Sequence, residues 1–115
     1  MSLTNYEVMN RLNIKPMSIS RGYQGRRFKT QLGKDFDTEM NYLLPKLKVP
    51  EGKLLLTLRF GFSSKMSDID NPLKLTIDCL QRKYDFNDKQ IYKLDVEKRD
   101  VKKGEEFIEF ELSTP

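Results

Sequence analysis

The sequence predicts an α+β fold in which helices pack on one face of a mixed or largely antiparallel sheet. Two observations indicate this fold. Segments with alternating apolar residues, typical of strands, are interleaved with two segments whose apolar residues recur every three to four positions, as in helices. In addition, 115 residues suffice for one hydrophobic core but not for two domains of ordinary size. We therefore expect a single domain over residues 1–115, with the element order β-α-β-α-β-β.

The first half of the chain supplies three of these elements. Apolar residues alternate between Tyr6 and Ile14, which predicts the first strand. A helical period then runs from Phe36 to Leu47 and is expected to end before Pro50. The alternation from Leu54 to Phe62 predicts the second strand, which leads into a short polar connection.

The second half begins with a helix from Pro72 to about Lys83. Asn71 is expected to cap it, because an asparagine accepts hydrogen bonds from free backbone amides and proline fits the first helical position. Its expected buried stripe is Leu73, Ile77, Leu80 and Tyr84. Two strands follow, one around Tyr92–Val96 and one around Ile108–Leu112, joined by a turn at Lys102-Lys103-Gly104.

Candidate catalytic residues gather where the second strand meets the second helix. Asp68 and Asp70 precede the helix, and Lys74 lies one turn inside it. Neighbouring carboxylates repel each other unless a cation or a proton lies between them, and Mg²⁺ prefers such hard oxygen ligands. Aspartates in this position can also serve only as helix caps or as favourable charges near the helix dipole. An EF-hand is excluded, because counting from Asp68 puts Leu73 at the required glycine.

A second acidic turn, which contains Asp85, Asn87 and Asp88, follows the predicted helix. Asp88 is the candidate for a third oxygen ligand. Asp and Asn are also common in ordinary turns, and for Asp85 we favour that structural reading.

Residues 66–98 resemble the RusA family of Holliday-junction resolvases in the order and spacing of their motifs, which are Asp68-Ile69-Asp70-Asn71, Lys74, Asp78, and Asn87-Asp88-Lys89-Gln90-Ile91 ahead of a strand. The resemblance implies that Asp68, Asp70 and Asp88 bind Mg²⁺, or Mn²⁺ in its place, and that Lys74 assists catalysis. It implies supporting roles for Asn71, Asp78, Asn87 and Gln90. The chain departs from the family pattern at two positions: Asn87 stands where many members carry an acid, and Ser20 stands where an Asn is expected.

Positive charge is concentrated in the first third of the chain. The net charge is +4 and the pI is about 9.2, and no acidic residue lies between Glu7 and Asp35. Such a one-sided run is typical of a surface that binds phosphate. The candidate DNA contacts are Lys15, Arg21, Arg26, Arg27 and Lys29, most of them in a glycine-containing loop. Tyr23 or Phe28 could stack on an unpaired base, or could pack on the core instead.

The composition excludes several classes of site. The chain has no histidine, and the single cysteine, Cys79, rules out an internal disulfide and a cysteine-rich zinc site. Cys79 is expected to be a small core residue. No phosphate-binding P-loop motif occurs, so a nucleotide cofactor is not expected. With no apolar run long enough to span a membrane, the expected location is cytoplasmic.

The leading hypothesis is a Mg²⁺-dependent, structure-selective endodeoxyribonuclease. The resemblance implies that it cuts four-way DNA junctions symmetrically as a homodimer in recombination and repair, and that it is a bacterial protein of phage or prophage type. Two alternatives stay open. One is a protein that binds branched DNA without cutting it, motivated by Asn87. The other is a protein-interaction domain with a basic loop whose aspartates are only caps.

Overall fold

The computed structural model describes residues 9–25 and 28–115. A four-stranded sheet forms one layer, with the strand order β1 (Asn10–Leu12), β6 (Phe107–Ser113), β4 (Leu54–Phe62) and β5 (Ile91–Asp100). The central strand β4 pairs antiparallel with β6 and parallel with β5, so the sheet is mixed as expected. At one edge of this sheet, β5 has β4 as its only neighbouring strand among the described residues.

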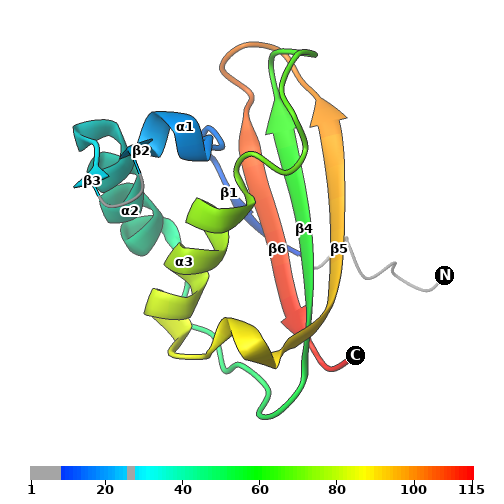
Figure 1. Ribbon diagram of the computed structural model, residues 1–115. Coiled ribbons are helices and arrows are strands. Elements are labelled where there is room, and N and C mark those ends of the chain that lie inside the picture. The colour runs from blue at the N-terminus through cyan, green and yellow to red at the C-terminus, as the bar shows by residue number, and fades with distance from the viewer. Residues whose placement is uncertain (1–8, 26–27) are drawn as a thin grey trace, which may run out of the picture.

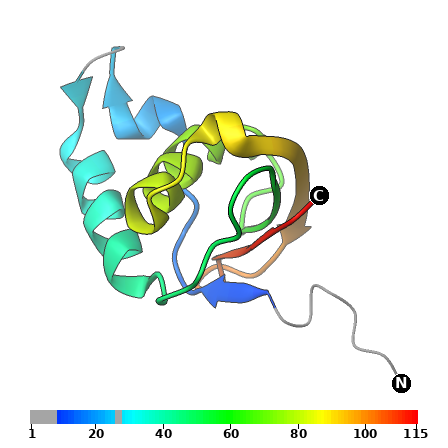
Figure 2. The same ribbon diagram turned by 90° about the horizontal axis from the view of Figure 1, so that it is seen from below.

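The helices form a second layer on one face of the sheet (Figures 1 and 2). They are α1 (Ile19–Gly22), α2 (Gln31–Leu43) and α3 (Leu73–Tyr84). A small hairpin of β2 (Tyr23–Gln24) and β3 (Phe28–Lys29) lies between α1 and α2. The α+β class is therefore confirmed, and α3 makes the crossover between the parallel strands β4 and β5.

The alternation in β4 places its core residues on the helix side, where Leu54, Leu56, Leu58 and Phe60 are fully buried. Opposite them, α3 presents a stripe that is rotated from the predicted one. Leu80 is fully buried as expected, whereas Leu73, Ile77 and Tyr84 are only partly buried. The most buried positions are instead Leu75, Thr76, Cys79 and Leu80, because α2 covers α3 on a second side (Figure 2).

The predicted bounds of α2 were wrong at its C-terminal end. Its N-cap is Thr30, whose hydroxyl accepts a hydrogen bond from the Gly33 amide at 3.1 Å. The helix ends at Leu43 because Pro45 disfavours helical backbone at Leu44, which is extended. Leu47, which the periodicity placed in the helix, lies in the following segment and is exposed.

The stretch from Ser20 to Lys29 was expected to be a loop, but it contains α1 and the β2–β3 hairpin. Glycine makes the close packing here possible. A Cβ on Gly33 would lie 2.3 Å from the Gly22 carbonyl oxygen, so α1 and α2 could not approach as they do. Gly25 has a φ of +73°, which suits the hairpin turn. Of the predicted first strand, Tyr6 and Val8 lie outside the described residues.

Candidate functional site

The two aspartates lie on the loop of residues 63–72, between the C-terminal end of β4 and the start of α3. Backbone contacts attach this loop to both layers. The Lys98 ammonium on β5 donates to the Ser67 carbonyl at 2.6 Å and to the Lys65 carbonyl at 3.2 Å. The Ile19 amide of α1 donates to the Asn71 carbonyl at 3.1 Å. The loop is therefore held at the end of the sheet between β5 and α1.

Asp68 and Asp70 are exposed on this loop. The Asn71 amide nitrogen donates to the Asp68 carboxylate at 3.4 Å, whereas the Asp70 carboxylate has no hydrogen bond to any described residue. The prediction that Asn71 caps α3 was wrong: the N-cap is Pro72, and no side chain caps the helix. The Asn71 amide group is directed to Asp68, and the chain turns through a hydrogen bond from the Leu73 amide to the Asp70 carbonyl at 3.1 Å.

Lys74 lies in the first turn of α3, close in sequence to Asp70. Its side chain is 62% exposed, and its ammonium lies 3.4 Å from the Asp78 carboxylate one turn further along. This is the helix-surface ion pair expected for these residue types at a spacing of four, and such exposed pairs contribute little to stability. The ammonium is therefore exposed and accessible to a ligand.

Asp88 lies in the short 3-10 helix η2 (Asp88–Gln90), which follows α3. Its backbone amide donates to the Gln81 side chain at 2.7 Å, and its own side chain is exposed. Asn87 and Gln90 form a capping box around η2, in which Asn87 accepts from the Lys89 amide and Gln90 accepts from the Asn87 amide. These two side chains therefore fix the turn that presents Asp88. Asp85, at the end of α3, has a φ of 53° and is the loop residue that we expected.

Within one chain, Asp88 in η2 follows the C-terminal end of α3, whereas Asp68 and Asp70 precede its N-terminal end; Figure 1 shows these two ends of α3 well apart. Twelve helical residues span about 18 Å. Strand β5 gives a similar separation. It begins at Ile91, three residues after Asp88, and its Lys98 contacts the aspartate loop. In an extended strand, Ile91 and Lys98 lie about 23 Å apart. Among residues 9–25 and 28–115, no group of three acidic, Cys or His side chains could hold a metal ion. The three aspartates predicted to bind metal therefore do not come together within a single chain.

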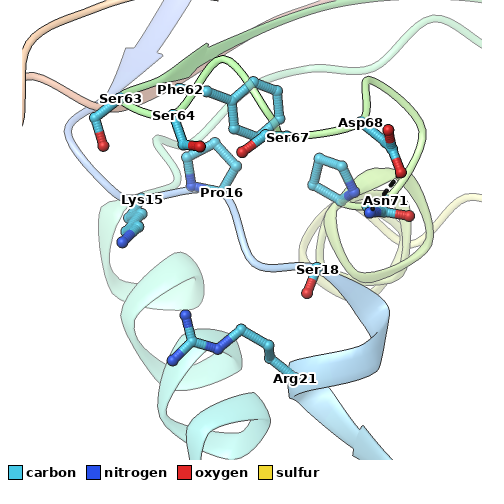
Figure 3. Close-up of a pocket in the computed structure, with 11 residues that line it drawn as sticks. Lys15, Pro16, Ser18, Arg21, Phe62, Ser63, Ser64, Ser67, Asp68 and Asn71 are labelled. Atoms are coloured by element: carbon cyan, nitrogen blue, oxygen red, sulfur yellow. Dashed lines mark hydrogen bonds between the residues drawn. The ribbon is translucent and has the colours of Figure 1, made fainter.

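The predicted DNA-binding residues are arranged in two ways. Lys15 and Arg21 line a hollow beside the aspartate loop, together with Asp68 and Asn71 (Figure 3). Lys29, by contrast, is only 18% exposed and forms an ion pair with Asp37 of α2, which also pairs with Arg82 at 3.6 Å, so its ammonium is engaged within the fold. Arg26 and Arg27 lie outside the described residues.

Three further side chains belong to the basic region or lie beneath it. Phe28 is 73% exposed, so its ring does not pack on the core. Tyr23 is partly buried, with the Lys29 ammonium 5.5 Å from its ring centroid. Cys79 is buried as expected and donates to the Asp37 carboxylate, and burial raises the pKa of its thiol to about 12. A thiol with this pKa is a poor nucleophile at neutral pH.

Sequence reasoning missed Lys98, which anchors the aspartate loop, and the two serines at the end of β4, Ser63 and Ser64, which line the hollow. The Ser63-Ser64 pair directly after a buried strand was a usable signal, because polar residues at a strand end often line a site. Lys98 gave no such signal, since its role depends on the parallel pairing of β5 with β4.

Comparison with protein families places the chain among DNA-cutting enzymes. The family model described as "Endodeoxyribonuclease RusA" matches residues 16–111, which include the aspartate loop, α3 and η2. The chain therefore belongs to the RusA family and is a Holliday-junction-resolving endodeoxyribonuclease that acts on branched DNA. No curated protein matches the sequence. In the described part of the chain, none of the helices has the length and apolar character needed to cross a membrane.

Proposed function

We propose that this protein resolves four-way DNA junctions by Mg²⁺-dependent hydrolysis, as a homodimer, in DNA recombination and repair. The observation that carries the metal requirement is the aspartate loop. It presents two exposed carboxylates, and the chain contains no histidine that could act as a general base. The donor set fits Mg²⁺, because the ion takes hard oxygen ligands and usually needs only one or two carboxylates besides water and substrate phosphate. Mn²⁺ accepts the same ligands.

Asp68 and Asp70 would hold the metal, with Asn71 orienting Asp68 through their hydrogen bond. When bound, Mg²⁺ lowers the pKa of water and offsets the charge of the reacting phosphate. Lys74, one turn inside α3, supplies a positive charge for the phosphate oxygens in the transition state. Without DNA this ammonium pairs with Asp78, one turn further along α3 and away from the aspartate loop, so it would leave Asp78 to contact the phosphate.

In a dimer, Asp88 of one copy could lie close to Asp68 and Asp70 of the other copy. Asp88 precedes the N-terminal end of β5, and the aspartate loop lies against the other end of the same strand. A two-fold axis across the edge strand β5 exchanges these ends, so that Asp88 of one copy approaches Asp68 and Asp70 of the other. The β5 edge suits such pairing, because Tyr92 and Leu94 are exposed there. We propose that each metal site takes Asp68 and Asp70 from one copy and Asp88 from its partner.

The proposed function is tested with a labelled four-way junction and a linear duplex of the same sequence, each incubated with Mg²⁺, Mn²⁺ or EDTA. We expect paired symmetric cuts in the junction with either metal ion, and none in EDTA or in the duplex. Tight junction binding without cuts under any metal condition would favour the binding-only alternative. Equal, weak binding to junction and duplex at the same salt concentration would contradict a junction-directed function altogether.

Replacing Lys74 by Met should lower the cleavage rate about a hundredfold, because it removes one preorganised positive group from the reacting phosphate. The melting temperature should change little, since the Lys74–Asp78 pair is exposed. Asp78→Asn is the matched control, because it breaks the same ion pair but leaves the ammonium in place. If both variants lose activity equally, Lys74 acts only through its pairing with Asp78.

A further inference from the structure

A hollow of about 290 Å³ lies next to the aspartate loop, between α1 and the end of β4. Figure 3 shows Lys15 and Asp68 on opposite sides of it, with Arg21 reaching in from α1. Ser18, Ser63, Ser64 and Ser67 add hydroxyl groups around its wall. Two cationic groups and several hydroxyls therefore surround one space that shares a wall with the candidate metal site.

The positive charges of the hollow are available to a ligand. Among the residues that the structure describes, no acidic side chain forms an ion pair with Lys15 or with Arg21. The pKa of the Glu106 carboxyl is lowered mainly by the hydrogen bond that it accepts from the Ser63 hydroxyl at 2.7 Å, with a further one from the Gly104 amide at 2.9 Å, and the charge of Lys15 is the smallest of the causes. Ser64 accepts from the Met66 amide at 3.2 Å, which leaves its own hydroxyl proton free to donate.

These groups match the phosphate of a DNA strand. A guanidinium can bind a phosphate through two parallel hydrogen bonds, and an ammonium and hydroxyls can donate to the remaining oxygens. A volume of 290 Å³ corresponds to about ten water molecules, which is more than a phosphate group alone needs. Phe62, Pro16 and Pro72 give the same hollow apolar surface, which suits the sugar ring attached to that phosphate.

We propose that this hollow binds the phosphate-and-deoxyribose unit adjacent to the phosphate that is cut, on the same DNA strand. This inference rests on the proposed function and extends it. Asp68 is the link: its carboxylate belongs both to the hollow and to the metal site, so a strand lying in the hollow continues directly to the reacting phosphate. Lys15 and Arg21 therefore set the register of the strand in the active site.

The test measures junction binding in EDTA, so that the result does not depend on catalysis. In Arg21→Ala the Kd should rise about tenfold, because a charge-assisted hydrogen bond is lost. The slope of log K against log salt should decrease by about 0.7 to 0.9, which corresponds to one phosphate contact. Lys15→Ala should behave similarly. Lys46→Ala serves as the matched control, because it also removes one exposed positive charge. Lys46 follows Pro45, whose carbonyl accepts a hydrogen bond from Tyr84 at the end of α3 that is opposite to the aspartate loop.

A second measurement locates the contact on the DNA. Junctions that carry one uncharged methylphosphonate are prepared, with the substitution placed in turn at each phosphate near the cut. In the wild type, the substitution next to the cut should weaken binding. In Arg21→Ala, the same substitution should cost less than in the wild type, because one of the two cations that face this phosphate is already absent. Equal affinity of Arg21→Ala and Lys46→Ala, or additive losses at that phosphate, would overturn the inference while wild-type cleavage stands. Failure of the wild type to bind or cut junctions would instead refute the proposed function.

Discussion

Asp70→Asn should reduce the rate of junction cleavage by about three orders of magnitude, because it removes a proposed metal ligand and a metal bound there would supply several kcal/mol of transition-state stabilisation. The fold should be unaffected. The Asp70 side chain is exposed, and the contact that Asp70 does make, from the Leu73 amide to the Asp70 carbonyl, uses the backbone and persists in the variant. Single-turnover cleavage with saturating protein and Mg²⁺ measures the effect.

Binding provides the control for this variant. In EDTA, Asp70→Asn should bind the junction as tightly as the wild type or more tightly, because one negative charge next to the DNA phosphate is lost. Asp35→Asn makes the same substitution on an exposed face of α2, where Gln31 is the one described residue that donates to the carboxylate, and it should keep full activity. If Asp70→Asn cuts at a rate within tenfold of the wild-type rate, Asp70 is not a metal ligand and the site has been placed wrongly.

The sequence predicted the scaffold well where local pattern and tertiary environment agree. The strand from Leu54 to Phe62 has the bounds that its alternation indicated, since one face of β4 packs on the helices along its whole length. The pattern was less reliable where a nearby residue mattered more than periodicity. Pro45 ended α2 although apolar residues continued to Leu47. The close packing of Gly22 on Gly33 allows the short helix α1 to pack against α2, in a stretch whose composition suggested a loop.

For the candidate site, sequence spacing predicts which residues carry chemistry but does not predict their arrangement in space. Asp68, Asp70 and Lys74 lie near one another in the fold because all three fall within seven consecutive residues. Asp88 follows the same helix, and only the direction of α3 shows that it lies at the other end. The helix start was also misjudged, because the Asn71 side chain is directed to Asp68 rather than to the amides of α3. Side-chain partners of this kind cannot be predicted from residue type alone.

Co-expression of Asp70→Asn with Asp88→Asn should restore nicking that neither variant shows alone. If each site combines Asp68 and Asp70 of one copy with Asp88 of its partner, a mixed dimer has one site with both substitutions and one intact site. Half of the dimers are mixed, so about a quarter of the wild-type number of sites should be active. The measurement is nicking of a labelled junction by the mixture and by each variant alone.

The products of the mixture distinguish the two possible arrangements of the site. A mixed dimer with one intact site should nick only one strand of each junction, so single nicks should accumulate and paired cuts should stay rare. If Asp88 instead acted with Asp68 and Asp70 of its own chain, every site in every dimer would carry one substitution, and the mixture would be as inactive as either variant. This inactive outcome would conflict with the separation seen across α3, and it would require η2 to move to the aspartate loop when DNA binds. Restored single-strand nicking would therefore establish both the dimer and the exchange of Asp88 between its subunits.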